Sequence, residues 1–262
     1  MKVKDIAKEM ENLAPKKLKE SYDNVGLMVG SEEKEVKKVL LALDCTNEVI
    51  EEAKREKVDL IITHHPLIFR KPSRIISEDL QGYKIIELIK NDISLYSSHT
   101  NLDSAKGGIN EEIVNILGFC EGEIMEKSKE SGYEQTGIGR IVTLEKEKSI
   151  LEIVDLVKEK LNIRSLRIAK GCETAKKIAI INGSGQDFFY KARKMGADCI
   201  ITGDTTYHFV SDYKEMGITI IDAGHFNTEF LVFKSVMKKI ENKFKDIEFI
   251  FSKVNSDPYQ FL

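Results

Sequence analysis

Apolar residues along this chain fall into short continuous runs, which alternate with longer segments of helical spacing. Runs such as 39–43 and 60–62 have the length of strands and are apolar at every position, which is typical of strands buried on both faces of a parallel sheet. Segments such as 46–57 place apolar side chains three or four residues apart, which indicates amphipathic helices. The alternation of the two patterns predicts an α/β fold.

The predicted elements fill the chain almost without interruption. After an N-terminal helix that stops at Pro15, the first half has strands 39–44, 59–64 and 93–98 and helices 46–57, 78–90 and 108–117. The second half has strands 139–144, 165–169, 177–182, 198–202, 218–222 and 247–253 and helices 149–161, 186–195, 206–216 and 227–243. A polar, glycine-containing stretch separates the halves. We expect a first α/β lobe over residues 1–125 and a second over 126–262, with no inserted third domain.

The two halves repeat each other. Lys38 is separated from Thr63 by the same number of residues as Lys177 is from Thr202, and a strand, a helix and a second strand fill each interval. Matching units of this kind indicate a duplicated lobe. The sequence therefore predicts two similar α/β lobes from an internal duplication, with one metal site between them.

Potential metal ligands follow the predicted strands of both halves. Each half has the pattern His-x-Asn-x-acid after a strand, from His99 to Asp103 and from His225 to Glu229. The first half adds adjacent histidines at 64 and 65, and the proline that follows favours a turn there. The carboxyl ends of strands are where open α/β sheets bind their ligands. We therefore look for chemistry at these strand ends.

The candidate ligand set is His64, His65, Asp103, His225 and Glu229. Three imidazoles and two carboxylates suit Zn²⁺, Fe²⁺, Mn²⁺ or Co²⁺ with open positions better than calcium or a closed structural zinc site. The carboxylates are able to bridge two ions. Taken one at a time, the same residues are also compatible with polar side chains at a turn or with helix caps. The repetition in both halves favours the metal site.

Other conspicuous groups have simpler interpretations. The run Gly183-Ser184-Gly185 between a strand and a helix suits either a phosphate or a tight turn, and the incomplete glycine pattern favours the turn. Phe226, Phe230 and Phe233 have the spacing of helical core or of a subunit interface. Four scattered cysteines contain no Cys-x-x-Cys motif and are expected to be reduced thiols.

Composition narrows the class of protein. The chain has 262 residues, of which 42% are apolar and 32% charged, as in ordinary globular proteins. A net charge of −3 makes nucleic acid an unexpected partner. No apolar run approaches the roughly 20 residues of a membrane span, and the N-terminus lacks the apolar stretch of a signal peptide. We expect a cytoplasmic protein.

Six motifs together resemble the NIF-three-like dinuclear-metal family, whose members are commonly described as GTP cyclohydrolase I type 2 homologues. The resemblance spans essentially the whole chain. The motifs are Tyr22-Asp23-Asn24-Val25-Gly26-Leu27-Met28-Val29-Gly30, Thr63-His64-His65-Pro66-Leu67-Ile68-Phe69, Ser98-His99-Thr100-Asn101-Leu102-Asp103, Gly203-Asp204-Thr205-Thr206-Tyr207-His208, Asp222-Ala223-Gly224-His225-Phe226-Asn227-Thr228-Glu229 and Ser256-Asp257-Pro258-Tyr259.

The resemblance implies a ligand set and an assembly. Its five metal ligands correspond to His64, His65, Asp103, His225 and Glu229, which would bind two divalent ions per chain, and relatives form ring-shaped homohexamers. Some relatives have an additional domain between the lobes, for which this chain has too few residues. Asp204 stands where relatives often have glutamate, so the charge is kept on a shorter arm.

Two histidines remain outside that ligand set. His99 is the internal counterpart of His225, yet the family pattern does not make it a ligand, so it is interpreted either as a partner or proton shuttle beside the site or as a core histidine. His208 is interpreted either as a general acid or base facing substrate or as a helix cap.

Three hypotheses about function follow. The first is a metal-dependent hydrolase in which two ions about 3.5–4 Å apart activate water against a nucleotide-like substrate, with His208 or His99 as proton donor. By resemblance the reaction would be the hydrolytic opening of a purine ring of GTP. The second is a non-catalytic metal-binding ring that handles metal or acts as a scaffold. The third, nucleic-acid binding through the hole of the ring, requires a lining of lysines.

Overall fold

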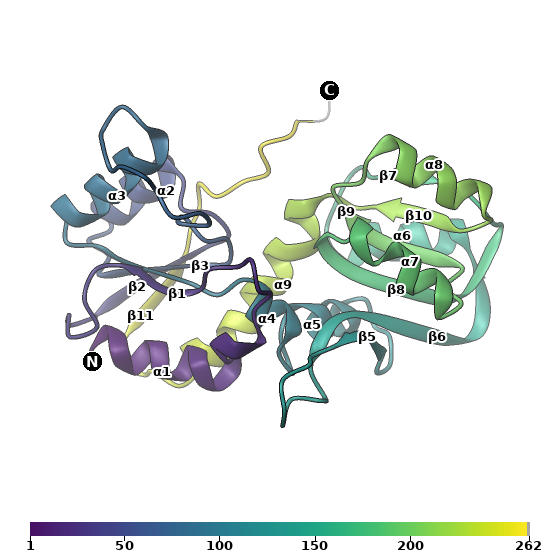
Figure 1. The fold of residues 1–262 in the computed structure, drawn as a ribbon, viewed down its shortest axis with the longest axis horizontal. Coiled ribbons are helices and arrows are strands. Elements are labelled where there is room, and N and C mark those ends of the chain that lie inside the picture. Colours follow the sequence, from purple (N-terminus) through teal and green to yellow (C-terminus); the bar gives the residue numbers. More distant parts are fainter. Residues whose placement is uncertain (261–262) are drawn as a thin grey trace. The chain divides into compact units, whose positions relative to one another are not determined.

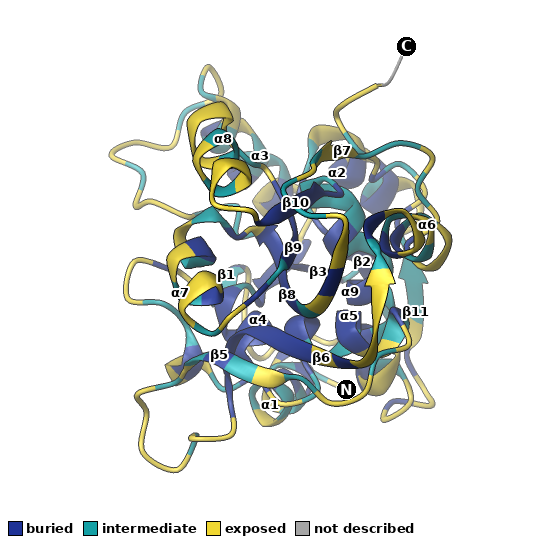
Figure 2. Cartoon of the chain, turned by 90° about the vertical axis from the view of Figure 1, so that its right-hand side faces the viewer, coloured by how far each residue is buried: buried dark blue, intermediate teal, exposed yellow. Residues whose placement is uncertain are grey.

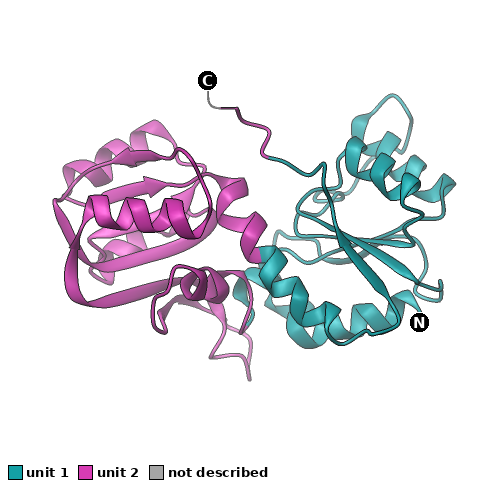
Figure 3. Ribbon diagram, turned by 180° about the vertical axis from the view of Figure 1, so that it is seen from behind, with its two compact units in different colours: residues 1–105, 233–256 teal, residues 106–232, 257–262 magenta. Residues whose placement is uncertain are grey.

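The chain divides into two compact units, each with a sheet of its own (Figures 1 and 3). The computed structural model describes residues 1–260. Unit 1 consists of residues 1–105 and 233–256, and unit 2 of residues 106–232 with the segment from Asp257 on. The sequence predicts two lobes that are each one continuous stretch, residues 1–125 and 126–262. In the structure each compact unit is made of two separate stretches of the chain.

Unit 1 is built on a five-stranded sheet in the order β1-β4-β3-β2-β11. The strands β4, β3, β2 and β11 run parallel to one another, and β1 at the edge is antiparallel to β4. All residues of β3 and β4 are buried, which is why their sequence is not alternating. The strands are β1 Gly26–Val29, β2 Lys38–Ala42, β3 Leu60–Thr63, β4 Ser94–Ser97 and β11 Glu248–Phe251.

Helices cover both faces of the unit 1 sheet. The helices α2 and α3 pack on one face through Val49, Ile50, Ala53, Ile85 and Leu88, and α1 lies on the other face (Figure 1). Thr46 caps α2 by accepting a hydrogen bond from the Val49 N–H at 3.1 Å. The helices are α1 Val3–Leu13, the 3₁₀ turn Lys16–Leu18, α2 Asn47–Arg55, α3 Leu80–Lys90 and α4 Thr100–Ser104.

Unit 2 is built on a six-stranded sheet in the order β5-β6-β8-β9-β10-β7. Its centre is parallel, from β8 through β9 to β10, and the flanking strands are antiparallel. Figure 2 shows the central strands as buried. The strands are β5 Glu123–Lys127, β6 Gly137–Ser149, β7 Arg167–Ala169, β8 Thr174–Ser184, β9 Cys199–Gly203 and β10 Thr219–Asp222.

Helices also cover the sheet of unit 2. The helices α7 and α8 pack on one face, where Phe189 and Ala192 enter the apolar core and Val210 and Tyr213 pack against it. The helix α5 contacts β6 and β8, and α6 contacts β6. These elements are α5 Ile109–Ile116, α6 Ile150–Lys160, the 3₁₀ turn Gln186–Phe188, α7 Phe189–Lys194 and α8 Tyr207–Glu215, and α9 His225–Glu241 begins in unit 2 and ends in unit 1.

The two sheets share the same internal design, which confirms the predicted duplication. In unit 1 the Asp59 N–H donates to the Lys38 carbonyl at 3.0 Å, and in unit 2 the Asp198 N–H donates to the Lys177 carbonyl at 2.8 Å. Each aspartate also accepts, through its carboxylate, hydrogen bonds from the backbone N–H of its lysine. The same contacts therefore fix the register of β2 with β3 in unit 1 and of β8 with β9 in unit 2.

The last strand joins a different sheet from the one that its position suggests. The predicted strand at 247–253 follows the second half of the chain, yet β11 pairs in parallel with β2 of unit 1. It does so because α9 leaves unit 2 and continues into unit 1. Within residues 1–260, no helix combines the length and the apolar character that crossing a bilayer requires.

Replacing Tyr96 with phenylalanine is expected to raise the free energy of unfolding by about 1 kcal/mol. Tyr96 in β4 is 1% exposed, and its hydroxyl has no hydrogen-bond partner among the described residues. A buried hydroxyl without a partner costs about 1–3 kcal/mol, which the phenylalanine avoids. Urea denaturation checks this. A variant that is less stable than the wild-type protein would contradict the expectation, because it would mean that the hydroxyl is bonded.

Candidate metal centre

Four of the candidate residues in unit 1 follow two neighbouring parallel strands. His64 and His65 come directly after β3, where their backbone N–H groups donate to the carbonyls of Ala42 and Leu43 and so continue the ladder with β2. His99 precedes α4 and Asp103 lies within α4, after the adjacent strand β4. The strand ends therefore bring these side chains to one edge of the sheet, as the sequence predicts.

The three imidazoles of unit 1 form a compact cluster. The ring centroids of His64, His65 and His99 lie 5.0–5.6 Å apart. One ring nitrogen of each lies within 4.8 Å of the other two, so the group could hold a metal ion. Asp103 adds a carboxylate oxygen 3.6 Å from His64 Nε2. His64 is fully buried, and Asp103 is buried as well.

Each imidazole of the cluster is oriented through its Nδ1. His64 Nδ1 lies 2.9 Å from the Ser98 carbonyl oxygen, which only accepts hydrogen bonds, so this nitrogen carries the proton. His65 Nδ1 and His99 Nδ1 lie 2.9 Å from carboxylate oxygens of Asp44 and Asp23. Histidine ligands of metals commonly donate Nδ1–H in this way and keep the Nε2 lone pair for the ion. The chemistry of the cluster thus fits a metal.

Asp23 is a buried carboxylate that the sequence pattern does not assign to the site. It accepts hydrogen bonds from the Thr100 N–H, the Thr100 hydroxyl and the Asn24 N–H as well as from His99. Burial raises the pKa of Asp23, but the hydrogen bonds from His99 and Thr100 outweigh burial and hold its pKa below the usual value. Asp23 is therefore an anion that fixes His99. Its presence in the family motif that begins at Tyr22 is the signal that could have found it.

The second pair of candidate ligands lies on the first turns of α9. His225 begins this helix and Glu229 follows one turn later, which places His225 Nε2 3.2 Å from Glu229 Oε2. Glu229 is only 2% exposed and accepts a hydrogen bond from Asn182 Nδ2 at 2.8 Å. The spacing of four residues thus places these two side chains on one face of α9.

Asp204 orients His225 in the way that Asp23 orients His99. Its carboxylate lies 2.7 Å from His225 Nδ1. The residue has a positive φ of 49°, a left-handed conformation that aspartate tolerates better than most residues. The backbone at the end of β9 thus turns the short arm toward His225, and this gives position 204 a specific role as a positioning residue.

Gly183 leaves room for the carboxylate of Glu229. It has a φ of +56°, and a Cβ atom at this position would lie 2.4 Å from Glu229 Oε1 and 3.3 Å from His225 Nε2. The Gly183 N–H donates to the Thr228 hydroxyl, and the Gly185 N–H donates to the Thr202 hydroxyl. These amides are engaged within the protein, which argues against a phosphate cradle. Gly183 and Ser184 form the irregular end of β8, and the turn toward the following helix begins at Gly185.

Replacing Gly183 with alanine is expected to weaken metal binding about 10- to 100-fold while the protein stays folded. The added methyl displaces the end of the Glu229 side chain and strains the backbone at a positive φ. Isothermal titration with Mn²⁺ measures the effect. Gly217→Ala is the control, because Gly217 also has a positive φ but a Cβ atom added there would have no neighbour within 4 Å. Equal losses in both variants would assign the effect to backbone strain alone.

His208 lies in the first turn of α8 and is exposed. The N-cap of this helix is Thr206, so the alternative that His208 caps the helix is wrong. Its ring packs edge to face against Tyr207 with centroids 5.3 Å apart. His208 belongs to unit 2, whereas the cluster of His64, His65 and His99 belongs to unit 1.

The cysteines take no part in these clusters. Cys45 and Cys199 are buried, and burial raises the pKa of the Cys45 thiol to about 12 and that of Cys199 further. Such thiols stay protonated at neutral pH. The candidate donors are therefore imidazoles and carboxylates.

This chain is similar to a family model, to curated relatives and to solved structures over nearly its whole length. The model of the Duf34/NIF3 (NGG1p interacting factor 3) family matches residues 1–258. A Clostridium perfringens protein named GTP cyclohydrolase 1 type 2 homolog is 58% identical over 264 residues, covering 100% of both chains. The crystal structure of Staphylococcus aureus protein SA1388 has a TM-score of 0.89 at 31% identity, covering 100% of this chain and 99% of that one. Reduced HcgD from Methanocaldococcus jannaschii has a TM-score of 0.85 at 31% identity, covering 97% and 98%.

Proposed function

The chain belongs to the Duf34/NIF3 family, and we propose that it is a dinuclear metal protein which hydrolyses a nucleotide-like substrate. The proposed ligands of the two divalent ions are His64, His65, Asp103, His225 and Glu229. The observation that supports this best is the orientation of the imidazoles: the Nδ1 atoms of His65 and His225 face carboxylates and that of His64 faces a carbonyl. Such partners leave each Nε2 available to a cation.

The donor set narrows the kind of metal. Imidazole nitrogens and carboxylate oxygens suit Zn²⁺, Fe²⁺, Mn²⁺ and Co²⁺, and no thiolate among the described residues takes part. Five protein ligands shared by two ions leave positions open, because catalytic ions of this class bind at least four ligands each. When bound, two such ions would lower the pKa of water and polarise an electrophilic group of the substrate.

His99 is the residue of unit 1 best suited to move a proton. Its Nδ1 faces the Asp23 carboxylate, so its Nε2 is the atom that would exchange a proton with a substrate. Asp23 would stabilise the protonated imidazolium. We propose His99 as proton donor, in preference to the exposed His208, because the His99 ring lies 5.3 and 5.6 Å from those of His64 and His65.

Aromatic side chains beside His99 support a planar substrate. The Phe69 ring lies 6.2 Å from the His99 ring, and the Tyr22 ring lies 6.2 Å from that of Phe69, all within unit 1. Asn24 donates a hydrogen bond at 2.6 Å to the Ile68 carbonyl and so holds the segment that carries Phe69. A flat base would gain contact area on these rings. The name of the relatives suggests GTP, and nothing in these rings selects guanine.

We also propose a homo-oligomeric ring, located in the cytoplasm. Unit 2 supports self-association through the exposed side chains of Phe209 on α8 and of Met216 directly after that helix. In α9, Phe226 and Phe230 stack with centroids 4.7 Å apart and are half-buried, whereas Phe233 belongs to the core. The six-fold state follows from resemblance to the family.

Turnover of GTP by metal-loaded protein tests the hydrolase. The wild-type protein should open the purine ring. The rate for Asp103→Asn should be at least about 100-fold lower, because a catalytic metal lowers the activation barrier by several kcal/mol. Asp92→Asn is the control, since Asp92 is an exposed aspartate of the same unit. Absence of turnover in wild-type protein that has bound its metal would reject the reaction and favour a metal-handling ring.

A further inference from the structure

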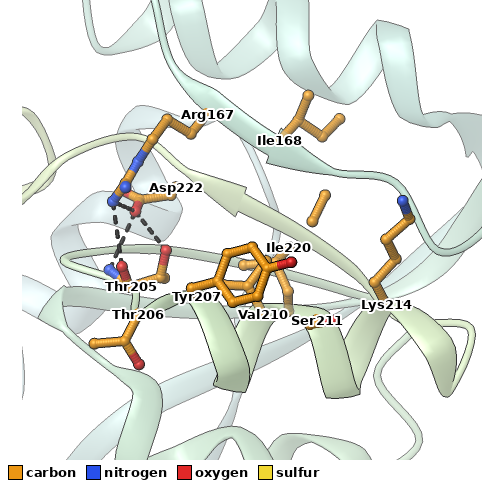
Figure 4. Close-up of a pocket in the computed structure, with 11 residues that line it drawn as sticks. Arg167, Ile168, Thr205, Thr206, Tyr207, Val210, Ser211, Lys214, Ile220 and Asp222 are labelled. Carbon is orange, nitrogen blue, oxygen red and sulfur yellow. Dashed lines mark hydrogen bonds and ion pairs between the residues drawn. The ribbon is translucent and has the colours of Figure 1, made fainter.

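Unit 2 contains a pocket of about 340 Å³ between β7, β10 and α8 (Figure 4). Such a volume lies within the range of about 300–1,000 Å³ that is typical of small-molecule sites. None of the five proposed metal ligands lines it. Its residues come from the edge strand β7, the turn after β9, one side of α8 and the end of β10.

The pocket exists because α8 packs loosely on its sheet. None of the residues of α8 is buried, whereas α6 buries Ile150, Ile153 and Val157 and α7 buries Phe189 and Ala192. Figure 2 accordingly shows α8 as mainly exposed. The space under the helix has an apolar lining made of Ile168, Ala169, Val210 and Ile220. This lining offers contact to an apolar or aromatic body.

The only carboxylate among the described residues that line the pocket is already satisfied by donors. Asp222 accepts hydrogen bonds from the Arg167 guanidinium, from the Thr205 N–H at 3.1 Å, from the Thr205 hydroxyl at 2.6 Å and from the Gly224 N–H at 3.0 Å. Its charge therefore stabilises the structure and is compensated. A cationic ligand would find no acceptor of comparable strength in the pocket.

The other charged groups of the lining, Arg167 and Lys214, are cations, and the hydroxyls of Thr206, Tyr207 and Ser211 can donate as well as accept hydrogen bonds. Lys214 is exposed, and within residues 1–260 no carboxylate lies within 4 Å of its ammonium group. It lies two turns along α8 from Tyr207, about 10 Å. In Figure 4 the Tyr207 ring stands between Arg167 and Lys214. The pocket thus combines an apolar lining, the aromatic ring of Tyr207 and the ammonium group of Lys214, which can bind an anion.

We propose that this pocket binds a small aromatic anion, with its ring against Ile168, Val210 and Tyr207 and its carboxylate or phosphate at Lys214. Stacking on the tyrosine and contact with the apolar lining supply the attraction for the ring. The ammonium of Lys214 supplies the attraction for the charge. The site is separate from the metal ligands, so it neither requires the proposed hydrolase nor supports it.

Fluorescence titration with anilinonaphthalene sulfonate tests the proposal, because the dye joins aromatic rings to one anionic group. Sulfonate is a weak ligand for divalent metals, so the titration reports on the pocket and not on the metal centre. Lys214→Glu and Ile168→Asp should each raise the dissociation constant about tenfold. Lys214 and Ile168 are exposed, the latter by 43%, so both variants should fold, which near-ultraviolet circular dichroism checks.

Two variants of the same unit serve as matched controls. Lys146→Glu reverses an exposed charge on β6, and Leu151→Asp replaces an apolar side chain on α6 that is 66% exposed. Neither residue lines the pocket, so the dissociation constant should change less than about twofold. The proposal is overturned if the wild-type protein shows no saturable binding, if either pocket variant binds like the wild-type protein, or if the controls weaken binding as much.

Discussion

Replacing Glu229 with glutamine should reduce the bound metal from about two ions per chain to one or fewer. Glutamine has the same shape and can still accept the hydrogen bond from Asn182, so the buried environment is preserved. The neutral amide is a much weaker ligand than the carboxylate. Loss of outer partners alone costs about 10- to 100-fold in metal affinity, so loss of this direct ligand should cost more than about 100-fold.

Elemental analysis of dialysed protein measures this change. Glu241→Gln, at the other end of the same helix, is the control and should keep its metal. Circular dichroism should show both variants folded. Full metal content in Glu229→Gln would show that Glu229 is not a ligand. Gly183→Ala would then also not be expected to weaken metal binding.

Replacing Phe189 with alanine should lower the free energy of unfolding by about 3–5 kcal/mol. Phe189 is fully buried in the core of unit 2, and its ring packs edge to face against Tyr213 with centroids 5.2 Å apart. The substitution removes both the buried area and the contact that joins α7 to α8. A cavity would remain, because the strands beneath it are fixed by their own hydrogen bonds.

Tyr190→Ala provides the matched control for Phe189→Ala. The Tyr190 side chain is 59% exposed, and the Lys194 ammonium lies over its ring, 4.6 Å from the centroid. Its loss should cost less than about 1 kcal/mol. Urea denaturation of metal-free protein compares the two variants. Similar costs would mean that α7 is not held by its buried face.

The parallel strands of both sheets could be predicted from the sequence, because strands buried on both faces leave continuous apolar runs. The edge strands β1 and β5 are only partly buried, and the sequence pattern does not predict them. The equal spacing of Lys38 to Thr63 and of Lys177 to Thr202 also predicts the duplication, which the matching hydrogen bonds of Asp59 and Asp198 confirm. The partner of the last strand could not be predicted. β11 joins β2, a contact between distant parts of the chain that periodicity does not encode.

The candidate ligands could be predicted because they follow strands, and parallel strands end at a common edge. The hydrogen bonds that orient the imidazoles could not be predicted, although Asp23 and Asp204 stand in the motifs that resemble the family. The Nδ1 partners Asp23, Asp44, Asp204 and the Ser98 carbonyl meet their imidazoles only in the folded chain. The glycine that accommodates Glu229 likewise reads in sequence as an ordinary turn.

The number of metal ions bound per chain tests the proposed dinuclear site most directly. Purified untagged protein, incubated with Zn²⁺, Fe²⁺, Mn²⁺ or Co²⁺ and then dialysed, would be measured by elemental analysis. Close to two ions per chain are expected for at least one of these metals. No bound metal after reconstitution with any of the four would contradict the assignment of His64, His65, Asp103, His225 and Glu229.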